Sequence, residues 1–193
     1  ALSTGPGISG IAIIRVSGKN TADVVKKITG DKLPFPRVAT LRKFNKNGAK
    51  ELIDEGVIIW FPAPNSYTGE DLAEFHVHGS RAVINAMHSA ISKIKNCRLA
   101  EPGEFTKRAF QNGRINLLKA ESIGDLISSE TEIQRKQALK IMSGKSADKF
   151  NSWRKKLLKI LSHIEAKIDF PDEDLPKNII REVQKTSNNV LSE

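Results

Sequence analysis

PNSYTGEDLAEFHVHGS, residues 64–80, is the stretch from which the architecture can be read most directly. Its first half is rich in Pro, Asn, Ser and Gly, which favour a loop. LAEFHVHG then alternates as a β-strand does, with Ala73, Phe75 and Val77 on its apolar side. Ser80 follows as a potential helix N-cap. The stretch therefore predicts a loop, a strand and a helix in succession, with Glu74 on the more polar strand face.

The residues before this stretch predict the rest of a sheet. GISGIAIIRVSG at residues 7–18 is a β-branched run between glycines, which is typical of a buried strand. Residues 21–29 have helical spacing of apolar side chains. Residues 37–44 and 51–61 have the pattern of a hairpin around the turn residues 45–48.

A second polar segment, EPGEFTKRAFQNGRINLLKAE at residues 101–121, follows the helix that should run from Ser80 to about Lys95. EPGEF has the composition of a helix start, and Gly113 is placed to end that helix. Both polar segments are too rich in paired charges and turn residues to be explained by packing alone. We therefore expect a site where they meet.

Beyond residue 117 the strand patterns vanish and helical periodicity continues, until FPDEDLP at residues 170–176 breaks the helix. The sequence thus predicts an α+β fold, in which a mixed-sheet domain of residues 1–116 is followed by an all-α segment of residues 117–193. The last residues resume a weaker helical pattern, whose apolar face we expect to be exposed or disordered. The uncapped end suggests a piece of a longer chain.

Composition narrows the class of protein. The 193 residues are 39% apolar and 27% charged, which is ordinary for a soluble globular protein. No apolar run approaches the roughly 20 residues that cross a bilayer, so we expect a cytoplasmic protein without a membrane partner. The single cysteine, Cys97, can form no internal disulfide, and no Cys/His quartet for zinc is present.

The formal charge of +9 is concentrated in one predicted helix. Between Arg135 and Lys167 the basic residues are opposed only by Asp148 and Glu165. Such a helix attracts phosphate through counterion release, although a solvated basic face has the same composition. A basic RNA-binding and dimerisation module without enzymatic activity is therefore an alternative function for this chain.

Three side chains are candidates for one ligand pocket. The Glu74 carboxylate can accept two parallel hydrogen bonds, as from the edge of a pterin, or it can pair with a neighbouring Lys or Arg. Arg15, at the end of an apolar strand, needs an acidic partner or a bound anion. Arg114 follows Gly113 at a helix C-terminus, where the helix dipole favours a cation even without a ligand.

Other polar residues have less specific patterns. His76 and His78 could share a metal, but no third ligand stands at a helpful spacing, and such a pair is more often structural. Glu70 and Asp71 are either a general acid/base pair or loop solvation. The tripeptide at residues 144–146 ends like a phosphate-binding loop, yet Leu139 stands where that motif requires glycine.

Four motifs together resemble a known family. They are STGPGISGIAIIRVSG, FPAPNSYTGEDLAEFHVHG, EPGEFTKRAFQNGRINLLKAE and IDFPDEDL, and they begin at residues 3, 61, 101 and 168. In this order and spacing they resemble the amino-terminal part of the MnmE family, also called TrmE, of tRNA modification GTPases. The resemblance runs from Ser3 to about Leu175.

The resemblance implies an amino-terminal α/β domain related to tetrahydrofolate-binding aminomethyltransferases, followed by the first half of a helical domain. A GTPase domain comes next in the family, so GTP hydrolysis, with its magnesium and potassium dependence, lies outside these residues. A free-standing aminomethyltransferase is a weaker alternative, because the helical tail argues against it.

The resemblance also implies the ligand and its contacts. The folate-contacting positions of the family fall on Arg15, Glu74 and Arg114, the last being often lysine in relatives. The ligand is a formyl or methylene tetrahydrofolate. The family forms a homodimer through the amino-terminal domain and works with MnmG, which carries FAD. The pair adds a carboxymethylaminomethyl or aminomethyl group at carbon 5 of the wobble uridine in tRNA.

Overall fold

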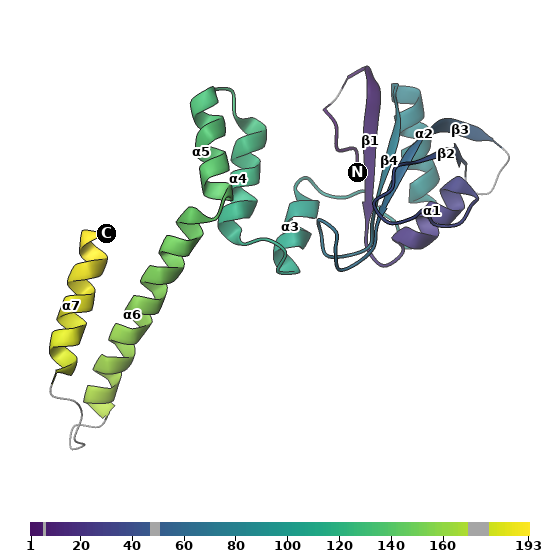
Figure 1. The fold of residues 1–193 in the computed structure, drawn as a ribbon. Helices are drawn as coiled ribbons and strands as arrows, with labels where there is room; N and C mark the ends of the chain where they lie inside the picture. The colour runs from purple at the N-terminus through teal and green to yellow at the C-terminus, as the bar shows by residue number, and fades with distance from the viewer. Residues whose placement is uncertain (6, 47–50, 170–177) are drawn as a thin grey trace. The chain divides into compact units, whose positions relative to one another are not determined.

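A four-stranded sheet forms the centre of the first part of the chain in this computed structural model, which describes residues 1–5, 7–46, 51–169 and 178–193 (Figure 1). The strand order is β1-β4-β3-β2, and each neighbouring pair is antiparallel. The strands are β1 (Ser9–Ser17), β2 (Thr40–Asn45), β3 (Leu52–Phe61) and β4 (Leu72–Gly79). The mixed character expected of the sheet is confined to one isolated parallel bridge, between Pro36 and Trp60.

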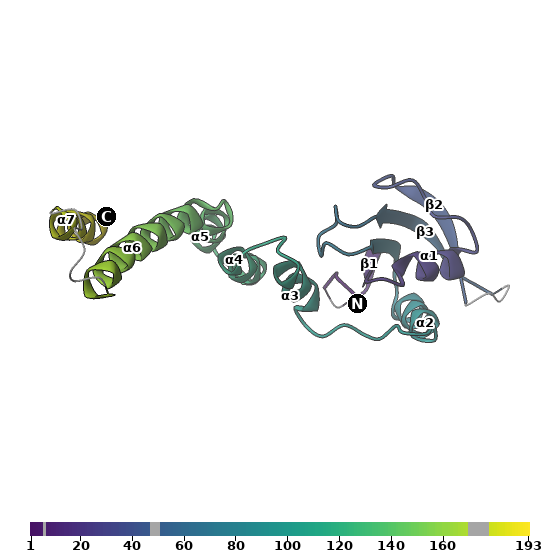
Figure 2. The ribbon, with the colours of Figure 1, turned by 90° about the horizontal axis from the view of Figure 1, so that it is seen from below.

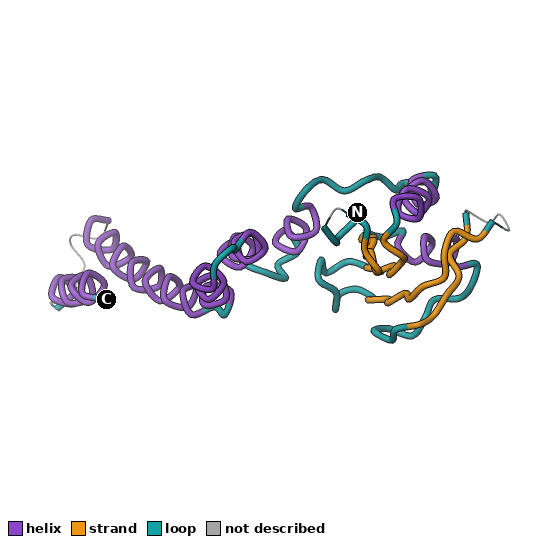
Figure 3. The backbone as a smooth tube through the Cα atoms, turned by 90° about the horizontal axis from the view of Figure 1, so that it is seen from above, coloured by secondary structure: helices purple, strands orange, loops and turns teal. Residues whose placement is uncertain are grey.

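Two helices, α1 (Thr21–Thr29) and α2 (Arg81–Ser92), lie on the same face of this sheet (Figure 3). Gly30 ends α1 in the left-handed conformation, and the Ser80 hydroxyl caps α2 by accepting from the backbone N–H of Val83 at 3.2 Å. The helices and the sheet bury an apolar core made of Ala12, Ile14, Val24, Val25, Ile28, Phe44, Ile58, Trp60, Ala73, Phe75, Val77, Met87, Ala90 and Ile94.

Gly56 allows β3 and β4 to approach each other closely. A Cβ atom on this residue would lie 2.1 Å from the backbone carbonyl oxygen of His76 and 3.1 Å from the ring of Phe44. No side chain fits at such a distance without moving the backbone. The glycine therefore fixes how β3 packs beside the segment of β4 that carries Glu74 and His76.

The chain divides into two compact units, Ala1–Asn116 and Leu117–Glu193, and each is described by itself. A third helix of the first unit, α3 (Glu104–Gln111), is followed by Gly113 in the left-handed conformation. This helix belongs to the second polar segment that the sequence singled out.

The second unit is helical, with α4 (Leu117–Ser128), α5 (Glu132–Met142), α6 (Lys145–Asp169) and α7 (Ile179–Ser192). A capping box between Thr131 and Gln134 begins α5. Figures 1 and 2 both show α7 beside α6. No side chain of α7 is buried, and α6 exposes Phe150, Leu157, Leu158, Leu161, Ile164 and Ile168.

These observations confirm the α+β class and the all-α segment after it. The predicted hairpin turn lies partly outside the described residues, and the predicted helix break at residues 170–176 lies wholly outside them. None of the helices in the described part of the chain is both long and apolar enough to cross a membrane.

Candidate functional site

Arg15 and Glu74 form an ion pair across neighbouring strands. The antiparallel register of β1 and β4 places the two residues directly opposite each other, and Arg15 Nε lies 2.8 Å from Glu74 Oε1. The Arg15 side chain is 37% exposed and the Glu74 side chain 15%. The acidic partner that Arg15 requires is therefore supplied by the protein itself.

The pair lies on the sheet face opposite α1 and α2. Along each strand the side chains alternate, so the buried Ile14 and Phe75 point to the helices and their neighbours Arg15 and Glu74 point away. On the other side of Glu74, the register of β3 places the half-buried Ile59. Glu74 thus presents its carboxylate on the open sheet face, between Arg15 of β1 and Ile59 of β3.

His76 contacts the second oxygen of the same carboxylate. Its Nε2 atom lies 3.2 Å from Glu74 Oε2, and its side chain is 25% exposed. His78, two residues further along β4, instead places Nδ1 2.8 Å from Asp54 Oδ1. The two histidines therefore contact different carboxylates.

Arg114 lies at the loop that precedes β4. Its backbone N–H donates to the Ala109 carbonyl at 2.8 Å, and its Cγ and Cδ would be 3.2 Å from a Cβ on Gly69. Among the described residues, no hydrogen bond or ion pair joins Arg114 to Arg15 or Glu74. The structure thus brings two of the three predicted residues into contact and places the third against the loop next to them.

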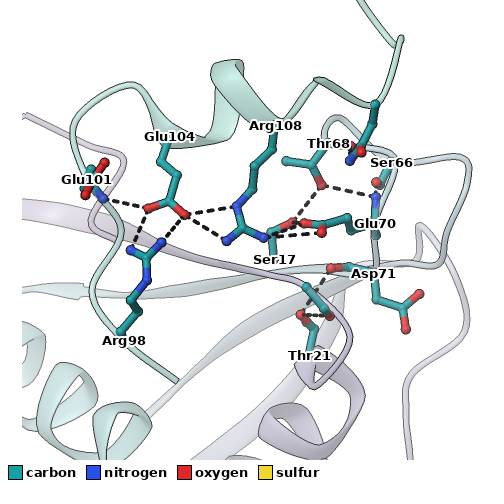
Figure 4. Close-up of polar contacts among 12 residues, drawn as sticks. Ser17, Thr21, Ser66, Thr68, Glu70, Asp71, Arg98, Glu101, Glu104 and Arg108 are labelled. Atoms are coloured by element: carbon teal, nitrogen blue, oxygen red, sulfur yellow. Dashed lines mark hydrogen bonds and ion pairs between the residues drawn. The ribbon is translucent and has the colours of Figure 1, made fainter. Parts of the chain in front are cut away.

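A chain of charged side chains holds α3 against this loop. Figure 4 shows Arg108 between Glu104 and Glu70. Arg108 Nη2 is 2.8 Å from Glu104 Oε1, and Arg108 Nη1 is 2.9 Å from Glu70 Oε2. Arg98 adds a bidentate pair to Glu104 at 2.7 and 2.8 Å.

Glu104 is the centre of this chain. Its side chain is only 9% exposed. Hydrogen bonds from Arg98, from the backbone N–H of Glu101 and from Arg108 lower the pKa of Glu104 to about 2. Glu104 therefore remains ionised through the neutral and mildly acidic range.

Thr68 anchors the loop from the inside. It is fully buried, and its hydroxyl lies 2.7 Å from Ser17 Oγ at the end of β1. Its carbonyl accepts from Asn112 Nδ2 at 2.7 Å. This hydrogen bond fixes the loop to the segment after α3, in which Arg114 follows Asn112 by two residues.

Sequence reasoning missed Glu104 and Arg108 as individual residues, although it singled out their segment. Their i, i+4 spacing on a helix was the available signal.

Glu70, considered as an acid/base or loop residue, accepts hydrogen bonds from Ser17 and Arg108. Asp71 accepts from the Ala63 backbone N–H at 2.9 Å. Both acidic residues thus take part in ordering the loop.

A cavity of about 490 Å³ opens between β1, α2 and α3. Arg15, Ser17 and Arg108 are among its lining residues, whereas Glu74 and Arg114 are not. A ligand held by Glu74 would therefore lie on the open sheet face instead of in this cavity.

Comparison with known proteins gives two family matches and close relatives. The profile described as "GTP-binding protein TrmE N-terminus" matches residues 1–114, and "MnmE helical domain" matches residues 117–193. A protein of Pelagibacter ubique named tRNA modification GTPase MnmE is 74% identical over 191 residues, covering 99% of this chain and 43% of the relative.

Two further proteins with the same name extend the comparison. One from Rickettsia akari is 44% identical over all of this chain and 43% of its own length. One from Parvibaculum lavamentivorans is 46% identical over 93% of this chain and 41% of its own length. The chain thus spans less than half the length of these relatives.

Proposed function

This chain belongs to the MnmE family of tRNA modification GTPases, and from that premise we propose that its first unit binds a one-carbon tetrahydrofolate, in formyl or methylene form. The observation that carries the proposal is the Arg15–Glu74 pair on the open sheet face. A carboxylate that is only 15% exposed suits a heterocycle that offers two adjacent N–H donors.

Glu74 retains acceptor capacity after its contacts within the protein. Each carboxylate oxygen has two lone-pair sites, and Arg15 and His76 each use one. The remaining site on each oxygen can accept one N–H group of the pterin ring. Arg15 balances the carboxylate charge, so binding a neutral ring edge leaves no unpaired ion.

Arg114 would hold an oxygen-bearing part of the ligand. A cation at this place suits a carbonyl or carboxylate oxygen, and a lysine there would supply the same charge with a different donor geometry. Because Arg114 packs on Gly69, its reach is set by the loop before β4. The three proposed contacts therefore come from β1, β4 and the segment after α3.

Arg114→Ala is expected to weaken folate binding roughly tenfold, since one charge-assisted hydrogen bond is lost. Arg114→Lys, which retains the charge, should stay within about threefold of the parent protein. Calorimetric titration of the three proteins measures both effects. Equal affinities for the alanine variant and the parent would remove Arg114 from the site.

The wider proposal concerns the pathway in which the bound folate is used. We place this chain in a homodimer formed through the first unit, together with MnmG and its FAD. The product would be the aminomethyl-type group at carbon 5 of the tRNA wobble uridine. GTP hydrolysis, with Mg²⁺ and K⁺, is assigned to residues beyond those of this chain, in which no complete phosphate-binding loop pattern occurs.

One titration tests the central proposal. The protein is titrated with 5-formyltetrahydrofolate in a calorimeter. The matched control is p-aminobenzoylglutamate, the part of the folate molecule that lacks the pterin ring system. Saturable binding of the folate without binding of the control is the expected result. Absence of saturable binding to the folate contradicts the proposal.

The basic helix α6 supports the second candidate, RNA binding. Arg154 and Lys155 are exposed on this helix, whereas Lys156 pairs with Glu193 of the same unit. Exposed cations on one helix suit phosphate contacts, each of which contributes to the salt dependence of affinity.

Replacing Arg154 and Lys155 by glutamine is expected to weaken tRNA binding and to lower the slope of log affinity against log salt by about two. Lys26→Gln with Lys27→Gln, which removes the same charge from exposed positions of α1, is the control. Filter binding over a salt series measures the slopes. Equal slopes for both double variants would rule out α6 as the specific RNA contact.

A further inference from the structure

We infer that His76 is a positioning residue, which holds the Glu74 carboxylate in the orientation that the folate requires; the inference rests on the folate-binding function proposed above. The basis is the contact of His76 Nε2 with Glu74 Oε2 at 3.2 Å, while Arg15 Nε contacts the other oxygen at 2.8 Å. With one donor on each oxygen, the carboxylate plane is fixed from both sides.

The surroundings of His76 direct its ring to Glu74. The residues opposite His76 on the neighbouring strands are Ile13 of β1 and Val57 of β3, and both are apolar. Among the described residues, the hydrogen bond of the imidazole ring goes to Glu74. A half-buried ring between aliphatic neighbours therefore has this carboxylate as its polar partner.

The direction of the hydrogen bond follows from the chemistry of the acceptor. An ionised carboxylate only accepts, so Nε2 must carry the hydrogen, in either the neutral Nε2–H tautomer or the imidazolium. Without this hydrogen bond the carboxylate could rotate more freely about its Cγ–Cδ bond. Restricting that rotation in advance lowers the entropy cost of binding a ligand at the remaining lone pairs.

Two amide variants separate this role from a general packing role. In glutamine the Nε2 atom is four bonds from Cα, as Nε2 is in histidine, whereas the amide nitrogen of asparagine is only three bonds away. His76→Gln can therefore donate to Glu74, and His76→Asn falls short of it. Both replacements introduce an amide into the same strand position, so a merely structural role would not distinguish their folate affinities in this way.

The experiment is calorimetric titration of the protein and its variants with 5-formyltetrahydrofolate, with circular dichroism as the check on folding. We expect His76→Gln to bind within about threefold of the parent and His76→Asn to bind roughly tenfold more weakly. His78→Gln, on the same strand face but paired with Asp54, is the control and should leave affinity unchanged. If the parent, His76→Gln and His76→Asn bound folate with equal affinity, the inferred role of His76 would be overturned and the proposed folate binding would not.

A protein that binds no folate at all would overturn both the role of His76 and the proposed function, so the two failures are distinguishable.

The tautomer of the His76 ring provides a second test, which requires no variant. Nitrogen-15 NMR of the unliganded protein should show a hydrogen on Nε2 of His76. A neutral ring with its hydrogen on Nδ1 would contradict the inferred hydrogen bond.

Discussion

Glu74→Ala is expected to abolish binding of 5-formyltetrahydrofolate, with an affinity loss of about 100-fold or more. The substitution removes both oxygen acceptors at once, and two charge-assisted hydrogen bonds together contribute roughly 3 kcal/mol. It also leaves Arg15 without its ion-pair partner. Isothermal titration calorimetry of the parent and variant proteins measures the loss.

The controls for this prediction separate binding from folding. Glu55→Ala removes an exposed carboxylate from the neighbouring strand β3, and its folate affinity should match that of the parent. Glu74→Gln keeps the shape of the side chain but replaces one acceptor by a donor, so it should also bind weakly. An alanine variant that remains folded and binds within threefold of the parent would show that Glu74 has only its structural pairing with Arg15.

Glu104→Ala is expected to lower the stability of the first unit. Glu104 accepts from Arg98, from Arg108 and from the Glu101 backbone, and its removal leaves those donors to be satisfied by water. Because both arginines are partly exposed, the loss of unfolding free energy should be about 2 kcal/mol rather than the larger cost of a fully buried pair.

Guanidinium unfolding followed by tryptophan fluorescence measures this loss. Trp60 lies in the core of the first unit, and replacing Trp153 by phenylalanine in every protein removes the second reporter. Glu101→Ala, at an exposed neighbour whose backbone contact is retained, is the matched control. A midpoint for Glu104→Ala equal to that of this control would contradict the bracing role of Glu104.

The same carboxylate gives a pH dependence whose sign follows from its pKa. The pKa of Glu104 is about 2 in the folded protein, against an ordinary value of 4.5. Its contribution to stability is therefore complete above pH 4.5 and is lost as the pH falls toward 2. The stability difference between the parent and Glu104→Gln should shrink over that interval, and a constant difference would contradict it.

Local chemistry was sufficient to predict most elements of the first unit. The alternation in LAEFHVHG corresponds to β4, the apolar spacing before Gly30 to α1, and Ser80 to the cap of α2. These patterns depend on neighbouring residues only. They could be read without knowing which strands lie side by side.

The pairing of side chains could not be predicted in the same way. Arg15 plainly needed a negative partner, but Glu74 is 59 positions away, and only the register of β1 against β4 selects it. Arg108 and Glu70 are separated by 38 positions and meet only because α3 packs on the loop. Residue chemistry made Arg15, Glu74 and Arg114 candidates, the family resemblance implies that they contact folate, and those contacts stay a prediction.

The bare backbone of Gly56 has a consequence for how this protein can change over generations. A single added methyl group there would collide with the main chain of the neighbouring strand, 2.1 Å away, where no rotamer adjustment can relieve it. We therefore expect any side chain at position 56 to displace the backbone of β3 or β4. Exposed positions of β2, such as Lys43, already carry a Cβ atom, so we expect tolerance to substitution to differ between positions of one sheet.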